Sequence, residues 1–110
     1  LDPTNGNLYH NVVSAAAYYS QTGKALQTLK LIHSYQVPIN QRDQHGRTPL
    51  ALLTFLGRRD KDQQVASLAH QLLKWQADAK TKDKQGFTPL DYCQQNHLAN
   101  TRGVILSYIS

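Results

Sequence analysis

One eight-residue segment occurs twice in this chain, and this internal repeat limits the possible folds more than any other feature. The sequence DQHGRTPL at residues 43–50 returns as DKQGFTPL at residues 83–90, an offset of 83 − 43 = 40 residues. Asp, Gly, Thr, Pro and Leu keep their places while the residues between them change. A period of this size is typical of proteins built from stacked structural repeats. We therefore expect a repeat architecture.

The repeated residues predict a tight turn that leads into a helix. The glycine of each copy can adopt the positive φ that a tight turn needs. The threonine can cap a helix with its hydroxyl group, and the proline after it suits the first helical position. In the second copy Asp91 follows Thr88 by three residues, which approximates a capping box. Each copy thus predicts the start of a helix.

The pattern D-x-x-G-x-T-P-L resembles the ankyrin repeat. The segments WQADAKTKD at residues 75–83 and VPINQRD at residues 37–43 are similar to the G-A-D-V-N-x-x-D segment of that family. The resemblance covers almost the whole chain, with a degenerate copy at the N-terminus. It implies an all-α, ankyrin-type helix-turn-helix repeat solenoid of about three repeats. We expect one domain over residues 1–110, with repeats at approximately 4–43, 44–83 and 84–110.

The chain departs from the ankyrin pattern in two ways. An ankyrin unit has about 33 residues, so a unit of 40 carries roughly seven more. Alignment places them between the two helices of a unit, around residues 17–24 and 57–63, as longer helices or as a longer connection. In addition, Gln36 and Gln76 stand where the family ends its second helix with glycine. A left-handed conformation there costs a residue with a side chain roughly 1 kcal/mol.

The resemblance also implies a function, the binding of a partner protein or peptide in a concave groove. Ankyrin repeats form this groove from their turn tips and first helices. The residues that differ between the copies are expected to point outward, and Phe55, Leu56 and Asn96 match further surface positions. The expected partner-binding residues are Arg42, Gln44, His45, Arg47, Lys82, Lys84, Gln85, Phe87 and Gln95.

Two of these residues have alternative interpretations. An exposed Phe87 among polar and basic residues has the character of an interface anchor, or else it packs onto Tyr92. Arg47 could hold a carboxylate of a partner, or it could be solvated and pair with an aspartate of the turns.

Composition leaves two further functional hypotheses. The net charge is +5, from twelve Lys and Arg and seven Asp, with no Glu. Such a surface favours an acidic partner. Nucleic-acid binding is a second hypothesis, but the basic residues are dispersed and, apart from Phe87, no aromatic residues lie among them. A third is a structural spacer in a multidomain regulator or effector.

The sequence favours a non-enzymatic chain without cofactor or metal. Cys93 and His97 lie four residues apart, but there is no second Cys/His pair for a zinc site and no third residue to orient the histidine. A small buried residue is the favoured role of Cys93. There is also no glycine-rich phosphate loop and no carboxylate pair.

The same features suggest where the protein acts. There is one cysteine, no apolar run long enough to span a membrane and no secretion signal, so we expect an intracellular protein, cytoplasmic or nuclear. The chain begins at Leu1 and has no Met, so we expect it to be a segment of a larger protein or a processed chain.

Overall fold

Helices make up the regular structure of the residues that the computed structural model describes, which are 8–19 and 22–109. No strand occurs in these two ranges. The helices are α1 (Leu8–Tyr19), α2 (Thr22–Ser34), α3 (Pro49–Leu56), the 3₁₀ helix η1 (Arg59–Lys61), α4 (Asp62–Lys74), α5 (Pro89–Gln95) and α6 (Ala99–Ile109).

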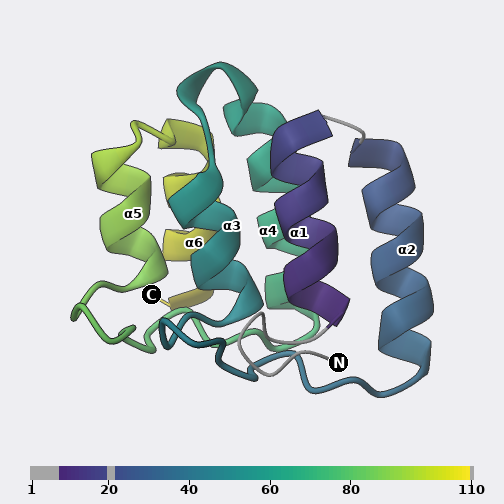
Figure 1. Ribbon diagram of the computed structural model, residues 1–110. Helices are drawn as coiled ribbons and strands as arrows, with labels where there is room; N and C mark the ends of the chain where they lie inside the picture. Colours follow the sequence, from purple (N-terminus) through teal and green to yellow (C-terminus); the bar gives the residue numbers. More distant parts are fainter. Residues whose placement is uncertain (1–7, 20–21, 110) are drawn as a thin grey trace.

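The α-helices form three antiparallel pairs that stack side by side (Figure 1). The first helices α1, α3 and α5 contact one another in one layer, and the second helices α2, α4 and α6 do so in the other. Buried apolar side chains fill the space between the layers, among them Leu29, Leu53, Leu72 and Ile105. Because each unit buries its apolar face only against its neighbours, this is the expected all-α repeat solenoid.

The predicted helix starts at Thr48 and Thr88 are confirmed. The hydroxyl group of Thr48 accepts a hydrogen bond from the backbone of Ala51, and Thr88 does the same for Asp91. The Asp91 carboxylate in turn accepts from the backbone N–H of Thr88 at 2.9 Å, which completes the capping box. A proline occupies the first turn of both helices.

The extra residues of the long units are accommodated in two ways. Helix α1 has 12 residues, whereas its counterpart α3 has 8, so the first unit lengthens its helix. Helix α2 begins at Thr22, so both helices of this unit extend into the segment 17–24 where the extra residues were expected. In the second unit the chain leaves the helix at Gly57 and forms η1 before α4 begins. This connection lies on the opposite side of the helix layers from the long loops between units (Figure 1).

Both glutamines at the ends of second helices have a left-handed backbone. The φ angle is 60° at Gln36 and 72° at Gln76. The chain therefore keeps the ankyrin-type helix end without the glycine that usually relieves it.

Two polar side chains connect one unit to the next. The amide of Asn96, at the end of α5, donates to the carbonyl oxygens of Thr54 and Phe55 at the end of α3. Asp62 at the start of α4 accepts from the backbone N–H groups of Asn100 and Thr101, and so caps α6. Both contacts satisfy helix-end groups that lack a partner within their own helix.

Candidate functional site

The two turns that project from the solenoid have the same hydrogen-bond pattern. We call residues 42–47 the first finger and residues 82–87 the second finger. In the first, the Asp43 carboxylate accepts from the N–H groups of His45 and Arg47 at 2.9 and 3.0 Å. In the second, Asp83 accepts from the N–H groups of the equivalent residues at the same two distances. The repeated aspartate is therefore needed to close each turn.

The glycine of the first finger is required for two reasons. Gly46 has a φ of 74°, which disfavours any side chain. A Cβ atom at this position would also lie 2.9 Å from the backbone nitrogen of Lys84, because the fingers are in direct contact. This contact includes a hydrogen bond from the Lys84 N–H to the His45 carbonyl oxygen at 3.0 Å. The fingers thus form one continuous edge.

A groove runs between the first finger and the first helices. It has a volume of about 420 Å³ and is lined by residues of α1, the first finger and α3. His45 and Gln44 line its finger side, and Leu52, Phe55 and Leu56 line its helix side. The first finger and the first helices α1 and α3 therefore enclose a hollow, and no residue of the second finger lines it.

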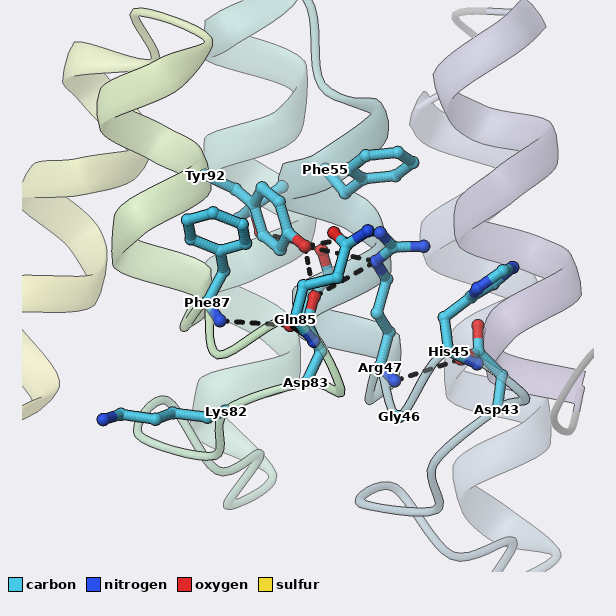
Figure 2. A network of polar contacts seen from close by, with 12 residues as sticks. Asp43, His45, Gly46, Arg47, Phe55, Lys82, Asp83, Gln85, Phe87 and Tyr92 are labelled. Carbon is cyan, nitrogen blue, oxygen red and sulfur yellow. Dashed lines mark hydrogen bonds and ion pairs between the residues drawn. The ribbon is translucent and has the colours of Figure 1, made fainter.

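Arg47 does not point outward, and this expectation from the sequence is wrong. Its side chain is 7% exposed, and its Nε lies 3.4 Å from the Asp83 carboxylate. Its guanidinium group contacts the hydroxyl group of Tyr92 and lies 3.8 Å from the centre of the Phe55 ring (Figure 2). The Tyr92 hydroxyl group also donates to Asp83. Arg47 thus joins two units, because a buried guanidinium needs an anionic partner and Asp83 of the second finger supplies it.

Arg42 is exposed as predicted, but its guanidinium group is also engaged within the chain. It donates to the Gly46 carbonyl oxygen at 2.9 Å and to the Lys82 carbonyl oxygen at 2.8 Å. The second bond crosses from one finger to the other. Arg42 therefore holds the fingers together.

The other predicted contact residues lie on the surface. Lys82 and Lys84 are exposed and form no ion pair with any residue in the described ranges. The remaining exposed members are Gln44, His45, Gln85, Phe87 and Gln95. The second finger thus presents two free ammonium groups and an amide.

Three aromatic rings gather beside the second finger. Phe87 and Phe55 are 36% and 40% exposed, and Tyr92 is buried between them. The centre of the Tyr92 ring lies 5.6 Å from that of Phe87 and 5.2 Å from that of Phe55 (Figure 2). The predicted packing of Phe87 on Tyr92 is therefore present, and the outer face of the Phe87 ring stays open. The repeated motif does not predict the role of Tyr92, because its polar partners, Arg47 and Asp83, lie on the two different fingers.

Burial raises the pKa of the Cys93 thiol to about 12, with a further contribution from the nearby Asp62 carboxylate. A thiol with this pKa is almost fully protonated near neutral pH and is a poor nucleophile.

In residues 8–19 and 22–109 no three His, Cys, Asp or Glu side chains form a group that could hold a metal ion. No helix in the same ranges is long and apolar enough to cross a membrane.

Stacked helix pairs with projecting fingers define a helical repeat protein of the solenoid class. The crystal structure of an ankyrin repeat domain from Acinetobacter baumannii has the same fold, with a TM-score of 0.67 and 24% identity over 87% of this chain and 46% of that one. No protein-family model matches the chain.

Sequence relatives agree with the fold. Ankyrin repeat domain-containing protein 13C of Xenopus tropicalis is 42% identical over 60 residues, which is 54% of this chain and 10% of that protein. The human protein of the same name is 42% identical over 52 residues, or 47% of this chain and 8% of that protein. The chain therefore spans only about a tenth of the length of these relatives. The relatives and the solved structure together support an ankyrin-type repeat in this chain and, with it, a generic protein–protein interaction module.

Proposed function

We propose that this chain binds a partner protein or peptide through the concave surface formed by the two fingers and the first helices. The open faces of Phe55 and Phe87 carry the proposal. Aromatic side chains that are fixed at one edge and exposed at the other are typical anchors of protein interfaces. Both rings are fixed by contact with Tyr92, so little conformational entropy is lost when a partner covers them.

The charge beside these rings supports a partner with an acidic surface. Lys82 and Lys84 present free ammonium groups, whereas the carboxylate of Asp83 between them is buried and paired with Arg47. If a partner covers the rings of Phe55 and Phe87, carboxylates next to that contact on the partner would lie close to Lys82 and Lys84. We also propose that Gln44, His45, Gln85 and Gln95 contribute polar contacts at the edge of the interface, where individual contributions are small.

The proposal places this binding inside the cell, in the cytoplasm or the nucleus. Nucleic-acid binding and a role as a spacer remain the alternatives, since the lysines of the second finger would also attract phosphate groups.

Site-specific photo-crosslinking tests the surface directly. With p-benzoylphenylalanine at position 87, a partner from cell lysate should be crosslinked, whereas the same group at position 35 should capture nothing. Tyr35 is a suitable control because it is 71% exposed and follows α2, in the other helix layer. Crosslinking from position 35 alone would show that another face binds.

Affinity measurements with the captured protein complete the test. Phe55→Ala and Phe87→Ala should each weaken binding at least about tenfold, and Tyr35→Ala should not change it. If nucleic acid is captured instead, and its affinity falls log-linearly with salt, the nucleic-acid hypothesis replaces this one.

A further inference from the structure

The connection between α3 and α4, which contains the extra residues of the second unit, forms a second hollow away from the fingers. This hollow has a volume of about 580 Å³. Arg59 of η1 lines one side, and Gln94, His97 and Arg102 of the third unit line the rest. Its size is within the usual range for small-molecule sites.

The charge in this hollow is positive and is not neutralised within the described part of the chain. Arg59 and Arg102 are exposed, and neither forms an ion pair with a residue in 8–19 or 22–109. No carboxylate lines the hollow. Two guanidinium groups that line one hollow favour a planar or tetrahedral anion.

The two acidic residues of the same connection are already engaged. Asp60 lies 3.4 Å from Arg58, with both side chains exposed to solvent. Asp62 is buried and accepts from the backbone of Asn100 at 2.6 Å and of Thr101 at 3.0 Å. Asp62 acts on Cys93 through its charge, but neither carboxylate lines the hollow or forms an ion pair with Arg59 or Arg102.

The floor of the hollow is apolar. It includes Cys93 and Leu98, which are 1% and 0% exposed, together with Ala99. The protonated thiol of Cys93 adds no negative charge there. The hollow thus combines a cationic rim with a small uncharged floor.

We propose that this hollow binds a phosphate monoester carried on an apolar body. The phosphate would accept hydrogen bonds from the guanidinium groups of Arg59 and Arg102, and the apolar body would lie against Ala99, the exposed apolar residue of the lining. Such a group occurs on a phosphorylated tyrosine side chain and on a mononucleotide. The site lies on the connection between helices, apart from the fingers, and does not depend on the function proposed for the concave surface.

The test uses phenyl phosphate, titrated into the whole chain at about 150 mM salt so that weak surface attraction is screened. Saturable shifts of the backbone NMR signals of residues 93–102 are expected. Arg59→Gln and Arg102→Gln should each weaken binding about tenfold, because a charge-assisted hydrogen bond is lost. Arg58→Gln is the matched control, since it lies on the same connection but does not line the hollow, and it should change affinity less than about twofold.

Further measurements define the ligand and can overturn the proposal. Adenosine monophosphate is titrated in parallel, and its affinity is compared with that of phenyl phosphate. Tighter binding of adenosine monophosphate indicates a nucleotide as the ligand, and tighter binding of phenyl phosphate indicates an aryl phosphate. Inorganic phosphate should bind more weakly than either, and Phe87→Ala should leave all affinities unchanged. The proposal is overturned if no saturable binding occurs, if inorganic phosphate binds as tightly, or if Arg58→Gln weakens binding as much as Arg59→Gln in variants of equal helicity.

Discussion

Arg47 of the first finger and Asp83 of the second form an ion pair that joins two units, with 3.4 Å between Nε and the carboxylate oxygen. Arg58 and Asp60 form a pair with the same separation on the surface. The side chains of the first pair are 7% and 1% exposed, and those of the second are 64% and 63% exposed. Because the two pairs have the same nitrogen–oxygen separation and differ in exposure, they allow a buried ion pair to be compared with an exposed one.

Asp83→Asn should therefore destabilise the chain far more than Asp60→Asn. Loss of the buried carboxylate leaves the Arg47 guanidinium without an anionic partner, and we expect the free energy of unfolding to fall by about 3 kcal/mol. The exposed pair should contribute no more than about 0.5 kcal/mol. Denaturant unfolding, followed by circular dichroism, measures both. Similar losses in the two variants would show that the Arg47 pair is effectively solvated.

The same carboxylate predicts sensitivity to acid. Burial alone would raise the pKa of Asp83, but hydrogen bonds from Tyr92, Phe87 and Gln85 and the Arg47 charge outweigh it, and the pKa is lowered. Because the pKa is lower in the folded state, the ionised carboxylate stabilises the fold at any pH above its pKa in the unfolded chain, which is about 3.9. This stabilisation is lost as the pH falls through the pKa of the folded state. Melting temperatures between pH 5 and pH 2 should fall less steeply for Asp83→Asn than for the unmodified chain.

His10 predicts a second pH dependence, in a higher range. Its Nε2 lies 2.8 Å from the Arg47 carbonyl oxygen, which requires the proton to be on that nitrogen. Burial lowers its pKa, although this hydrogen bond and the Asp43 charge oppose the shift. Below the unfolded value of about 6.5 the unfolded chain therefore binds more protons, so the free energy of unfolding decreases as the pH falls.

Thermal unfolding between pH 7.5 and pH 5 tests the role of His10. His10→Gln can still donate to the carbonyl oxygen but does not titrate, so its melting temperature should depend less on pH. His33→Gln, at an exposed position, is the control and should keep the slope of the unmodified chain. An unchanged slope in His10→Gln would assign the pH dependence to other groups.

The fold could be predicted from the sequence because its determinants are local and occur twice. Thr88 and Asp91 cap a helix three residues apart, and Gly46 forms its turn within one finger. Residues with local roles of this kind are visible in a 40-residue repeat without knowledge of tertiary contacts. The ankyrin resemblance rested on these residues and was confirmed.

Pairing of Arg47 with an aspartate of the turns was one of the two interpretations of the sequence, but its burial could not be predicted, because burial depends on contacts between units. Arg47 differs from its counterpart Phe87, and variation between copies suggested a residue free to face a partner. Its actual partners, Asp83 and Tyr92, are 36 and 45 residues away in the sequence (83 − 47 and 92 − 47). The hydrogen bond from Arg42 to the Lys82 carbonyl oxygen could not be foreseen for the same reason, since Lys82 lies on the other finger. Variation between copies does not separate contacts with a partner from contacts between neighbouring units.

The left-handed Gln76 predicts a stabilising substitution. Its φ of 72° is unfavourable for a residue with a side chain, and Gln76→Gly should raise the free energy of unfolding by up to about 1 kcal/mol. Gln71→Gly, within α4, is the control and should lower it by about 1 kcal/mol, because glycine is a poor helix former. If both changes destabilise the chain, the contacts of the Gln76 side chain stabilise the fold by more than its left-handed backbone destabilises it.

Cys93 provides a probe of local opening in the third unit. With a pKa of about 12, only about one thiol in ten thousand is ionised at pH 8, and the residue is 1% exposed. We expect the folded chain to react with a disulfide reagent far more slowly than a free thiol does, and denaturant should restore the normal rate. Leu98→Ala should increase the rate in the folded state, because Leu98 is fully buried in the same unit and its loss favours opening. A reaction rate close to that of a free thiol, without denaturant, would mean that α5 and α6 separate readily.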